Sequence, residues 1–297
     1  MKTTIIVVIT LVHAIAMGQS FEETIKKEMS FEKKSSANTV LIANINGHIK
    51  VAGYEGDKVI VEVNKYVHGK TEARLEKGKQ EIQLGIIDRA DTLIFYTQDG
   101  CMPFGQNKSA REKNRWNYNG WGYNWNCNNG SCNNDKTYDH KMNYTVKVPR
   151  GVNIILSTVN DGDITVEKVR GAVRVNNVNG SIRLTDLASQ VDAHTINGDV
   201  DIDYTVNPLD ECRFYTLNGD INALFMKGLA ADLSFESFNG DFYTNIDEIK
   251  PLPAKVEKSE KGEGIRFKVT GNRYQVGKGG VFLDFETFNG NVYLKEK

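Results

Sequence analysis

The sequence predicts an all-β fold, a single-domain parallel β-helix (solenoid) built from turns of 18 to 21 residues. A glycine preceded by Asn or Asp recurs at positions 162, 180, 198, 219 and 240, so the successive spacings are 18, 18, 21 and 21 residues. Repetition at such a period is the sequence signature of a solenoid. A related Asn-Gly pair returns at 289–290, 50 residues after the last of these glycines.

The second observation is the alternation of apolar and polar residues around each glycine. A period of two is typical of a half-buried strand, and a helical period does not fit. The apolar positions lie two and four residues after the glycine, as in the pairs Ile164/Val166, Ile182/Leu184, Val200/Ile202, Ile221/Ala223 and Val292/Leu294.

The third observation is that two short strands per repeat cannot bury their own apolar face. Stacking each repeat on the next pairs every strand in parallel with its copy, about 4.8 Å away. We therefore expect Ile182, Val200 and Ile221 to lie directly above one another. Asn-Gly is expected at a corner, because both residues tolerate positive φ. A β-sandwich is the alternative, but its strands do not repeat residues at a fixed offset from one turn motif.

The chain begins with the pattern of a secretory signal peptide at residues 1–18: one lysine, an apolar run from Ile5 to Ala16, and small residues. This run is too short to span a membrane, and no transmembrane segment is expected in the mature chain. We therefore expect an exported protein that is periplasmic, attached to the cell surface or secreted. Residues 19–37 form a polar N-terminal segment.

The predicted solenoid domain covers residues 38–297 and has two excursions besides its insert. An early repeat surrounds Gly47, with Val40 and Ile42 before it and Ile49 and Val51 after it. Residues 54–97 depart from the repeat, with strands and a short charged helix expected at 72–82. Residues 246–275 contain two prolines and a charged run, which indicates a second excursion before the last turn.

An insert at 98–140 differs from the rest of the chain, being rich in aromatic residues and asparagine and poor in aliphatic residues. Such a segment cannot build a core and is expected to be a long surface loop or a disordered insert. Exposed rings could stack on a glycan or a neighbouring cell-surface protein, or they could fold back onto the solenoid as a lid. The candidate ligand-binding residues are Trp116, Tyr118, Trp121, Tyr123 and Trp125.

A strand of the form Tyr-x-Val-x-Val-Pro-x-Gly at 144–151 leads into turns of the form Asn-Gly-Asp-Ile-x-Val. With the closing segment 280–290, this order resembles the exported bacterial β-solenoid domains labelled "putative adhesins". The resemblance covers about 38–66 and 142–297 and leaves the aromatic insert outside. It implies a repeated β-solenoid fold at the cell surface, and it supplies no catalytic residues.

Aspartates follow three of the repeat glycines, at Asp199, Asp220 and Asp241, and Asp163 and Ser181 extend the row. Stacked carboxylates repel one another, and Ca²⁺ would relieve this because it prefers several oxygen ligands. Aspartate is also common at solvated turns, so this row is a weak candidate for a calcium site. No cofactor is expected.

Four cysteines in an exported protein suggest disulfides. Cys212 occupies an inward position of the repeat and is expected to be a buried thiol. The disulfide candidates are then Cys101, Cys127 and Cys132, of which two can pair, and a metal site that also uses His140 is the less favoured alternative.

Function is less constrained than fold. A net charge of −1 gives no electrostatic case for nucleic-acid binding. The motifs of serine hydrolases, zinc proteases and nucleotide-binding loops are absent from the sequence. We therefore expect a non-enzymatic scaffold or adhesin-like module. The alternative is a carbohydrate-active β-helix enzyme that uses an outer sheet face, and two carboxylates about 5–10 Å apart in one cleft would favour it. Outward residues include acids and bases of the right types, but no constellation stands out among them and no catalytic residue is assigned: Arg174, Arg183, Asp192, His194, Asp201, Asp203 and Arg213.

Overall fold

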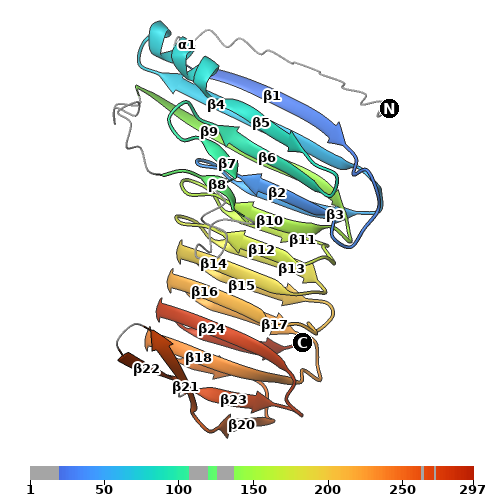
Figure 1. Cartoon of the computed structure of the whole chain (residues 1–297), viewed down its shortest axis with the longest axis vertical. Coiled ribbons are helices and arrows are strands. Elements are labelled where there is room, and N and C mark those ends of the chain that lie inside the picture. The colour runs from blue at the N-terminus through green and yellow to red at the C-terminus, as the bar shows by residue number, and fades with distance from the viewer. Residues whose placement is uncertain (1–19, 107–119, 126–136, 262–263, 271) are drawn as a thin grey trace. The chain divides into compact units, whose positions relative to one another are not determined.

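The computed structural model describes residues 20–106, 120–125, 137–261, 264–270 and 272–297. In these residues the protein is all-β, with two large sheets, two two-stranded sheets and one helix (Figure 1). The chain divides into two compact units, residues 1–179 and 180–297. The expected solenoid domain, 38–297, therefore includes parts of both units, and the expected signal peptide lies outside the described residues.

In the first unit, one sheet has the strand order β1-β4-β9-β3-β11 and the other has the order β12-β10-β2-β6-β5. A short antiparallel pair, β7 and β8, is formed by part of the insert. The elements of this unit are β1 Ser20–Met29, β2 Thr39–Ala43, β3 Ile49–Tyr54, β4 Val59–Gly69, α1 Glu72–Glu81, β5 Gln83–Asp88, β6 Thr92–Gln98, β7 Phe104–Gln106, β8 Trp121–Tyr123, β9 Tyr138–Pro149, β10 Asn153–Ser157, β11 Ile164–Glu167 and β12 Val173–Asn176.

The early repeat around Gly47 is stacked as the sequence predicts. β2 pairs in parallel with β10, so that Val40 faces Ile154, and β3 pairs in parallel with β11, so that Ile49 faces Ile164. The expected helix is also present, and the side chain of Thr71 accepts a hydrogen bond from the backbone N–H of Arg74 at its start. The core lies between the two sheets, where the hydroxyl groups of Thr97 on β6 and Tyr144 on β9 are 3.1 Å apart.

The polar segment at 19–37 is more ordered than the sequence suggests. Its residues Ser20–Met29 form β1, which pairs antiparallel with β4 over ten residues. The charged residues obscured this strand, yet Phe21, Ile25 and Met29 are partly buried along it. Phe21 packs beneath the ammonium of Lys79, which lies 4.7 Å from the ring centroid. Charged side chains are common on strands at a sheet edge, where they discourage pairing with other molecules.

The second unit has one sheet with the order β13-β15-β17-β25-β19 and another with the order β20-β23-β18-β24-β16-β14. The strands β21 and β22 form a separate antiparallel hairpin within the segment 246–275. The strands of this unit are β13 Ile182–Leu187, β14 Val191–Asn197, β15 Val200–Tyr204, β16 Cys212–Asn218, β17 Ile221–Phe225, β18 Ala231–Asn239, β19 Phe242–Thr244, β20 Ile249–Leu252, β21 Lys255–Lys261, β22 Gly264–Thr270, β23 Arg273–Val276, β24 Val281–Asn289 and β25 Val292–Glu296.

The predicted stacking of Ile182, Val200 and Ile221 is confirmed, because these residues are direct partners in parallel strands. The expected order of the turns is wrong at the C-terminal end. Val292 pairs with both Ile221 and Phe242, so the last turn of the sequence lies between the turns of Gly219 and Gly240. Figure 1 shows the same order for β16, β24 and β18. On its other side, β18 pairs with the antiparallel strand β23. The parallel stack of this sheet therefore ends at β18, the strand that leads into the Gly240 turn.

The Asn-Gly corners are held by ladders of side-chain hydrogen bonds. The amide of Asn218 donates to Asn197 at 2.8 Å, Asn289 donates to Asn218 at 2.7 Å, and Asn239 donates to Asn289 at 2.8 Å. We expected asparagine here for its tolerance of positive φ, but none of these asparagines is among the described residues with positive φ. Asparagine is instead favoured because its amide can both donate and accept along the stack.

Candidate functional site

The described part of the aromatic insert folds into the hairpin β7–β8 and packs against β2 and β6. Tyr96 stacks on Phe104 with ring centroids 4.4 Å apart, and Phe104 stacks on Trp121 at 6.0 Å. Buried residues on the outer face of β2, Leu41 and Ala43, belong to the same apolar cluster. The expectation that this insert contributes nothing to a core is therefore wrong for its described residues. We call β7, β8, Asn124 and Trp125 the aromatic hairpin.

Tyr123 anchors the aromatic hairpin. Its side chain is only 8% exposed, and its hydroxyl lies 2.8 Å from the carbonyl oxygen of Thr97 and 3.0 Å from that of Ala43. Burial raises the pKa of Tyr123 well above its ordinary value, so the phenol stays protonated and can donate. This arrangement corresponds to the lid interpretation, in which the ring covers apolar surface.

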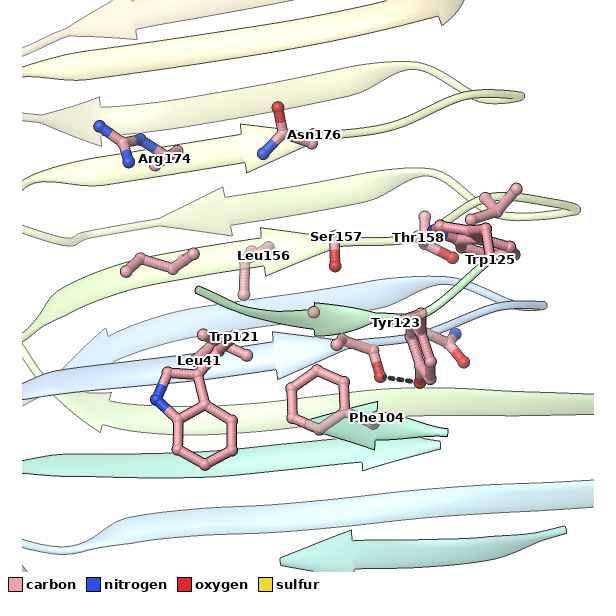
Figure 2. A pocket seen from close by; sticks show the side chains of 15 residues that line it. Leu41, Phe104, Trp121, Tyr123, Trp125, Leu156, Ser157, Thr158, Arg174 and Asn176 are labelled. Atoms are coloured by element: carbon pink, nitrogen blue, oxygen red, sulfur yellow. Dashed lines mark hydrogen bonds between the residues drawn. The ribbon is translucent and has the colours of Figure 1, made fainter. Parts of the chain in front are cut away.

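Trp125 is the most exposed described residue of the insert's candidates. Figure 2 shows Trp125 beside Thr158, beyond Tyr123. Its side chain is 50% exposed and its ring lies 5.7 Å from that of Tyr123. Trp121 is partly buried and has the guanidinium of Arg89 5.9 Å from its ring. The remaining candidates, Trp116 and Tyr118, lie outside the described residues.

A pocket of about 40 Å³ lies between the aromatic hairpin and the outer face of β10 and β12. Its polar and aromatic lining includes Trp125, Ser157, Arg174 and Asn176 (Figure 2). A water molecule needs roughly 10–15 Å³ of such space, whereas ligand pockets usually measure about 300 Å³ or more. The pocket therefore accommodates a few water molecules, and a larger partner would contact the exposed face of Trp125 instead.

The outer face of β2 carried a signal that would have predicted this lid. Residues 40–43 are apolar without alternation, as are residues 93–95 on the neighbouring β6. A short run of this kind indicates a strand buried on both faces. The sequence therefore implied that some other segment covers the outer face here, and the aromatic insert was the segment available.

The aspartate row forms a second ladder along the corners of the second unit. The backbone N–H of Asp220 donates to the carboxylate of Asp199 at 2.9 Å, and the N–H of Asn291 donates to Asp220 at 2.7 Å. The N–H of Asp241 then donates to Asn291 at 3.0 Å. The expected neighbours Asp220 and Asp241 are thus separated by Asn291. The carboxylates of Asp199 and Asp220 each accept from a backbone amide, which accounts for aspartate at these two positions without a cation. Among the residues that the structure describes, no group of three potential ligands is placed to hold a metal ion.

This ladder yields a prediction about Asp220. Replacing it by alanine removes the acceptor of the Asn291 N–H and should lower the free energy of unfolding by about 0.5–1.5 kcal/mol. Asp220→Asn keeps an acceptor oxygen and should be near neutral. Chemical denaturation with and without millimolar Ca²⁺ tests both points. A Ca²⁺-dependent stabilisation of the wild type that Asp220→Asn abolishes would contradict the structural role.

Cys212 is buried, as the sequence predicts, and burial raises the pKa of its thiol. Its sulfur lies 3.2 Å from the hydroxyl of Tyr204 and accepts from the N–H of Val191 at 3.4 Å. The candidates Cys127 and Cys132 lie outside the described residues, so their pairing with each other or with Cys101 stays a prediction.

A groove that the sequence analysis did not identify lies on the outer face of β13, β15, β17 and β25. It encloses about 340 Å³. Four outward residues, one from each strand, are partners of one another across neighbouring strands: Arg183, Asp201, Asn222 and Tyr293. Arg183 and Asp201 form an ion pair at 3.1 Å, and Asn222 donates to the same carboxylate at 2.9 Å. Alternation in the sequence identifies each of these residues as outward-facing, but only the strand register shows that they are neighbours.

The carbohydrate-enzyme alternative has its clearest geometric counterpart in this groove. Asp201 and Asp203 both line it and are two residues apart on one strand, which corresponds to roughly 7 Å. Asp201 is bound by Arg183 and Asn222, and Asp203 pairs with Lys297. Arg183 also lines the groove, whereas Arg174, Asp192, His194 and Arg213 do not. His194 and Asp192 bond each other at 2.6 Å on β14.

Neither the protein-family models nor the curated proteins contain a match to this chain. Two solved structures are similar. One is described as a "putative cell adhesion protein" from Clostridium sporogenes, with 12% identity, a TM-score of 0.42, and coverage of 92% of this chain and 100% of that chain. The other, a "putative adhesin" from Bacteroides fragilis, has 10% identity, a TM-score of 0.35, and coverage of 92% and 97%.

Within the described residues, no helix is both long enough and apolar enough to cross a bilayer.

Proposed function

We propose that the protein is an exported, non-enzymatic β-solenoid that acts as an adhesin-like surface module. The support for a solenoid is the parallel register within each unit, in which equivalent residues of successive repeats are direct partners. The support for export is the sequence pattern of residues 1–18. In this proposal the stacked strands act as a scaffold, and a glycan or a cell-surface protein is bound on their outer face.

The observation that carries the binding role is the unequal burial of the aromatic hairpin. Tyr123 is buried in the apolar cluster, and its hydroxyl group donates to two carbonyl oxygens. Trp125, at the end of the same row of rings, keeps half of its side chain exposed. An exposed ring held by a packed neighbour offers contact area that is ordered before a partner binds, which lowers the entropic cost of binding.

Trp125→Ala tests this role. We expect the free energy of unfolding of the variant to stay within about 0.5 kcal/mol of the wild-type value, because the side chain is half exposed. Binding to glycan arrays or to intact cells should fall at least tenfold. Trp121→Ala is the matched variant, and its partly buried ring should cost stability as well. If Trp125→Ala binds like the wild type, the aromatic hairpin is a lid only.

A carbohydrate-active enzyme is the second candidate, favoured by the placement of Asp201 and Asp203 in one groove. A glycosidase needs one carboxyl group to donate a proton. Both carboxylates instead bind donors within the protein: Asp201 binds Arg183 and Asn222, and Asp203 binds Lys297. Release of reducing ends from polysaccharides, lost in both Asp201→Asn and Asp203→Asn, would establish the enzyme and overturn the non-enzymatic proposal.

A further inference from the structure

We propose that the groove on the outer face of β13, β15, β17 and β25 is a binding site for an uncharged oligosaccharide. This site is separate from the aromatic hairpin and does not depend on the role proposed for it. The inference rests on the shape of the groove, the aromatic wall at one side, and the balance of charge along its lining.

The shape of the groove follows from the lengths of the side chains that neighbour one another across the four strands. Asp201 and Asn222, which are short, lie on the two central strands, and the longer Arg183 and Tyr293 lie on the strands to either side. Three strand spacings separate the two outer strands, which is about 14 Å. The enclosed volume of about 340 Å³ lies within the range of small-molecule sites. The groove is therefore wide enough for sugar rings and is open along its length.

Tyr293 supplies a flat aromatic wall whose position is fixed from behind. Its ring stacks on that of Tyr243, with centroids 5.1 Å apart and planes 12° apart. The hydroxyl of Tyr293 accepts from the amide of Asn291 at 3.4 Å. Lys295 lies 5.5 Å from the Tyr293 ring and is exposed, so its flexible chain can move aside. The C–H face of a pyranose ring packs on such a ring, much as other apolar groups do.

The floor of the groove, formed by Asp201 and Asn222, supplies hydrogen-bonding groups that suit the hydroxyl groups of a sugar. The Asp201 carboxylate can accept about one further bond, because a carboxylate has about four acceptor sites and Arg183 and Asn222 together donate three bonds to it. The Asn222 amide is exposed and retains a carbonyl oxygen and a second N–H for a ligand. The lining includes two cations, Arg183 and Lys295, and two carboxylates, Asp201 and Asp203. This balance favours an uncharged ligand with many hydroxyl groups over an acidic or basic one.

Calorimetric titration of the full chain with tetrasaccharides tests the inference. The probes are the tetramers of glucose in β-1,4 and α-1,4 linkage, mannose, xylose and N-acetylglucosamine, with tetragalacturonate as the acidic counterpart. We expect at least one uncharged tetramer to bind with a Kd of 1 mM or lower. Tyr293→Ala should weaken that binding at least tenfold. Asn222→Tyr fills the floor, removes only the exposed hydrogen bond to Asp201, and should abolish binding.

The controls separate this site from other surfaces. Tyr215→Ala removes an outward tyrosine from β16 in the opposite sheet and should bind like the wild type. Trp125→Ala should also leave this binding unchanged, so failure of the aromatic-hairpin proposal and failure of this one give different results. Circular dichroism verifies that each variant is folded. The inference is overturned if no uncharged tetramer binds at millimolar concentration, if only tetragalacturonate binds, or if Asn222→Tyr binds normally.

Discussion

Replacing Tyr123 by alanine is expected to destabilise the first unit by about 3–5 kcal/mol, the usual cost of deleting a large buried aromatic ring. The ring is 8% exposed and packs edge-on against Phe104 at 5.2 Å within the apolar cluster on β2 and β6. Deleting it leaves a cavity and also leaves the carbonyl oxygens of Ala43 and Thr97 without their donor. Urea denaturation followed by tryptophan fluorescence measures the change, because the tryptophans of this chain all lie in the insert.

Tyr123→Phe separates the two contributions. It keeps the ring and removes only the hydroxyl group, so we expect a loss of about 1–3 kcal/mol from the buried carbonyl oxygens. Trp125→Ala serves as the exposed control, for which little loss is expected. If Tyr123→Ala unfolds at the urea concentration of Trp125→Ala, the aromatic hairpin contributes no stability, and its packing on β2 is incidental.

The sequence was sufficient to predict the register of the repeats. Fixed offsets from each glycine identified Ile182, Val200 and Ile221 as vertical neighbours, since alternation decides which residues face inward and the repeat decides which ones stack. It was insufficient to predict the order of the turns. The Phe-Asn-Gly triplets at 238–240 and 288–290 are identical, so nothing local indicates which of them follows the turn of Gly219.

The candidate sites were harder to predict than the fold, because the aromatic hairpin belongs to a segment outside the repeat and the groove depends on side chains from several repeats. The aromatic residues of the insert could be identified as a group, but not which ring would be buried. That outcome depends on whether a ring reaches the open face of β2, and Tyr123 does so from the end of β8. The groove depends on side-chain length across four strands, which becomes informative only after the register is known.

Gly219→Ala, at a repeat corner of the second unit, is expected to lower the free energy of unfolding by about 2–5 kcal/mol. Gly219 has φ +152°, and a Cβ atom added there would lie 2.2 Å from the carbonyl oxygen of Gly198 in the neighbouring turn. The neighbouring atom is backbone and is held by the Gly198 N–H bond to Asn218 at 2.9 Å, so it cannot move aside cheaply. The substitution thus combines an unfavourable backbone conformation, about 1–3 kcal/mol, with overpacking, about 1–3 kcal/mol.

Two other glycines separate these contributions. Gly228 has φ +79° and no atom within 4 Å of an added Cβ, so Gly228→Ala measures the conformational cost alone and should lose about 1–2 kcal/mol. Gly151 also has open space around an added Cβ, and its φ is not positive, so Gly151→Ala should be neutral or slightly stabilising. Thermal and urea unfolding of the three variants gives the comparison. Close stacking of the corners requires that Gly219→Ala lose clearly more than Gly228→Ala, and equal losses would mean that the turns can separate to admit a methyl group.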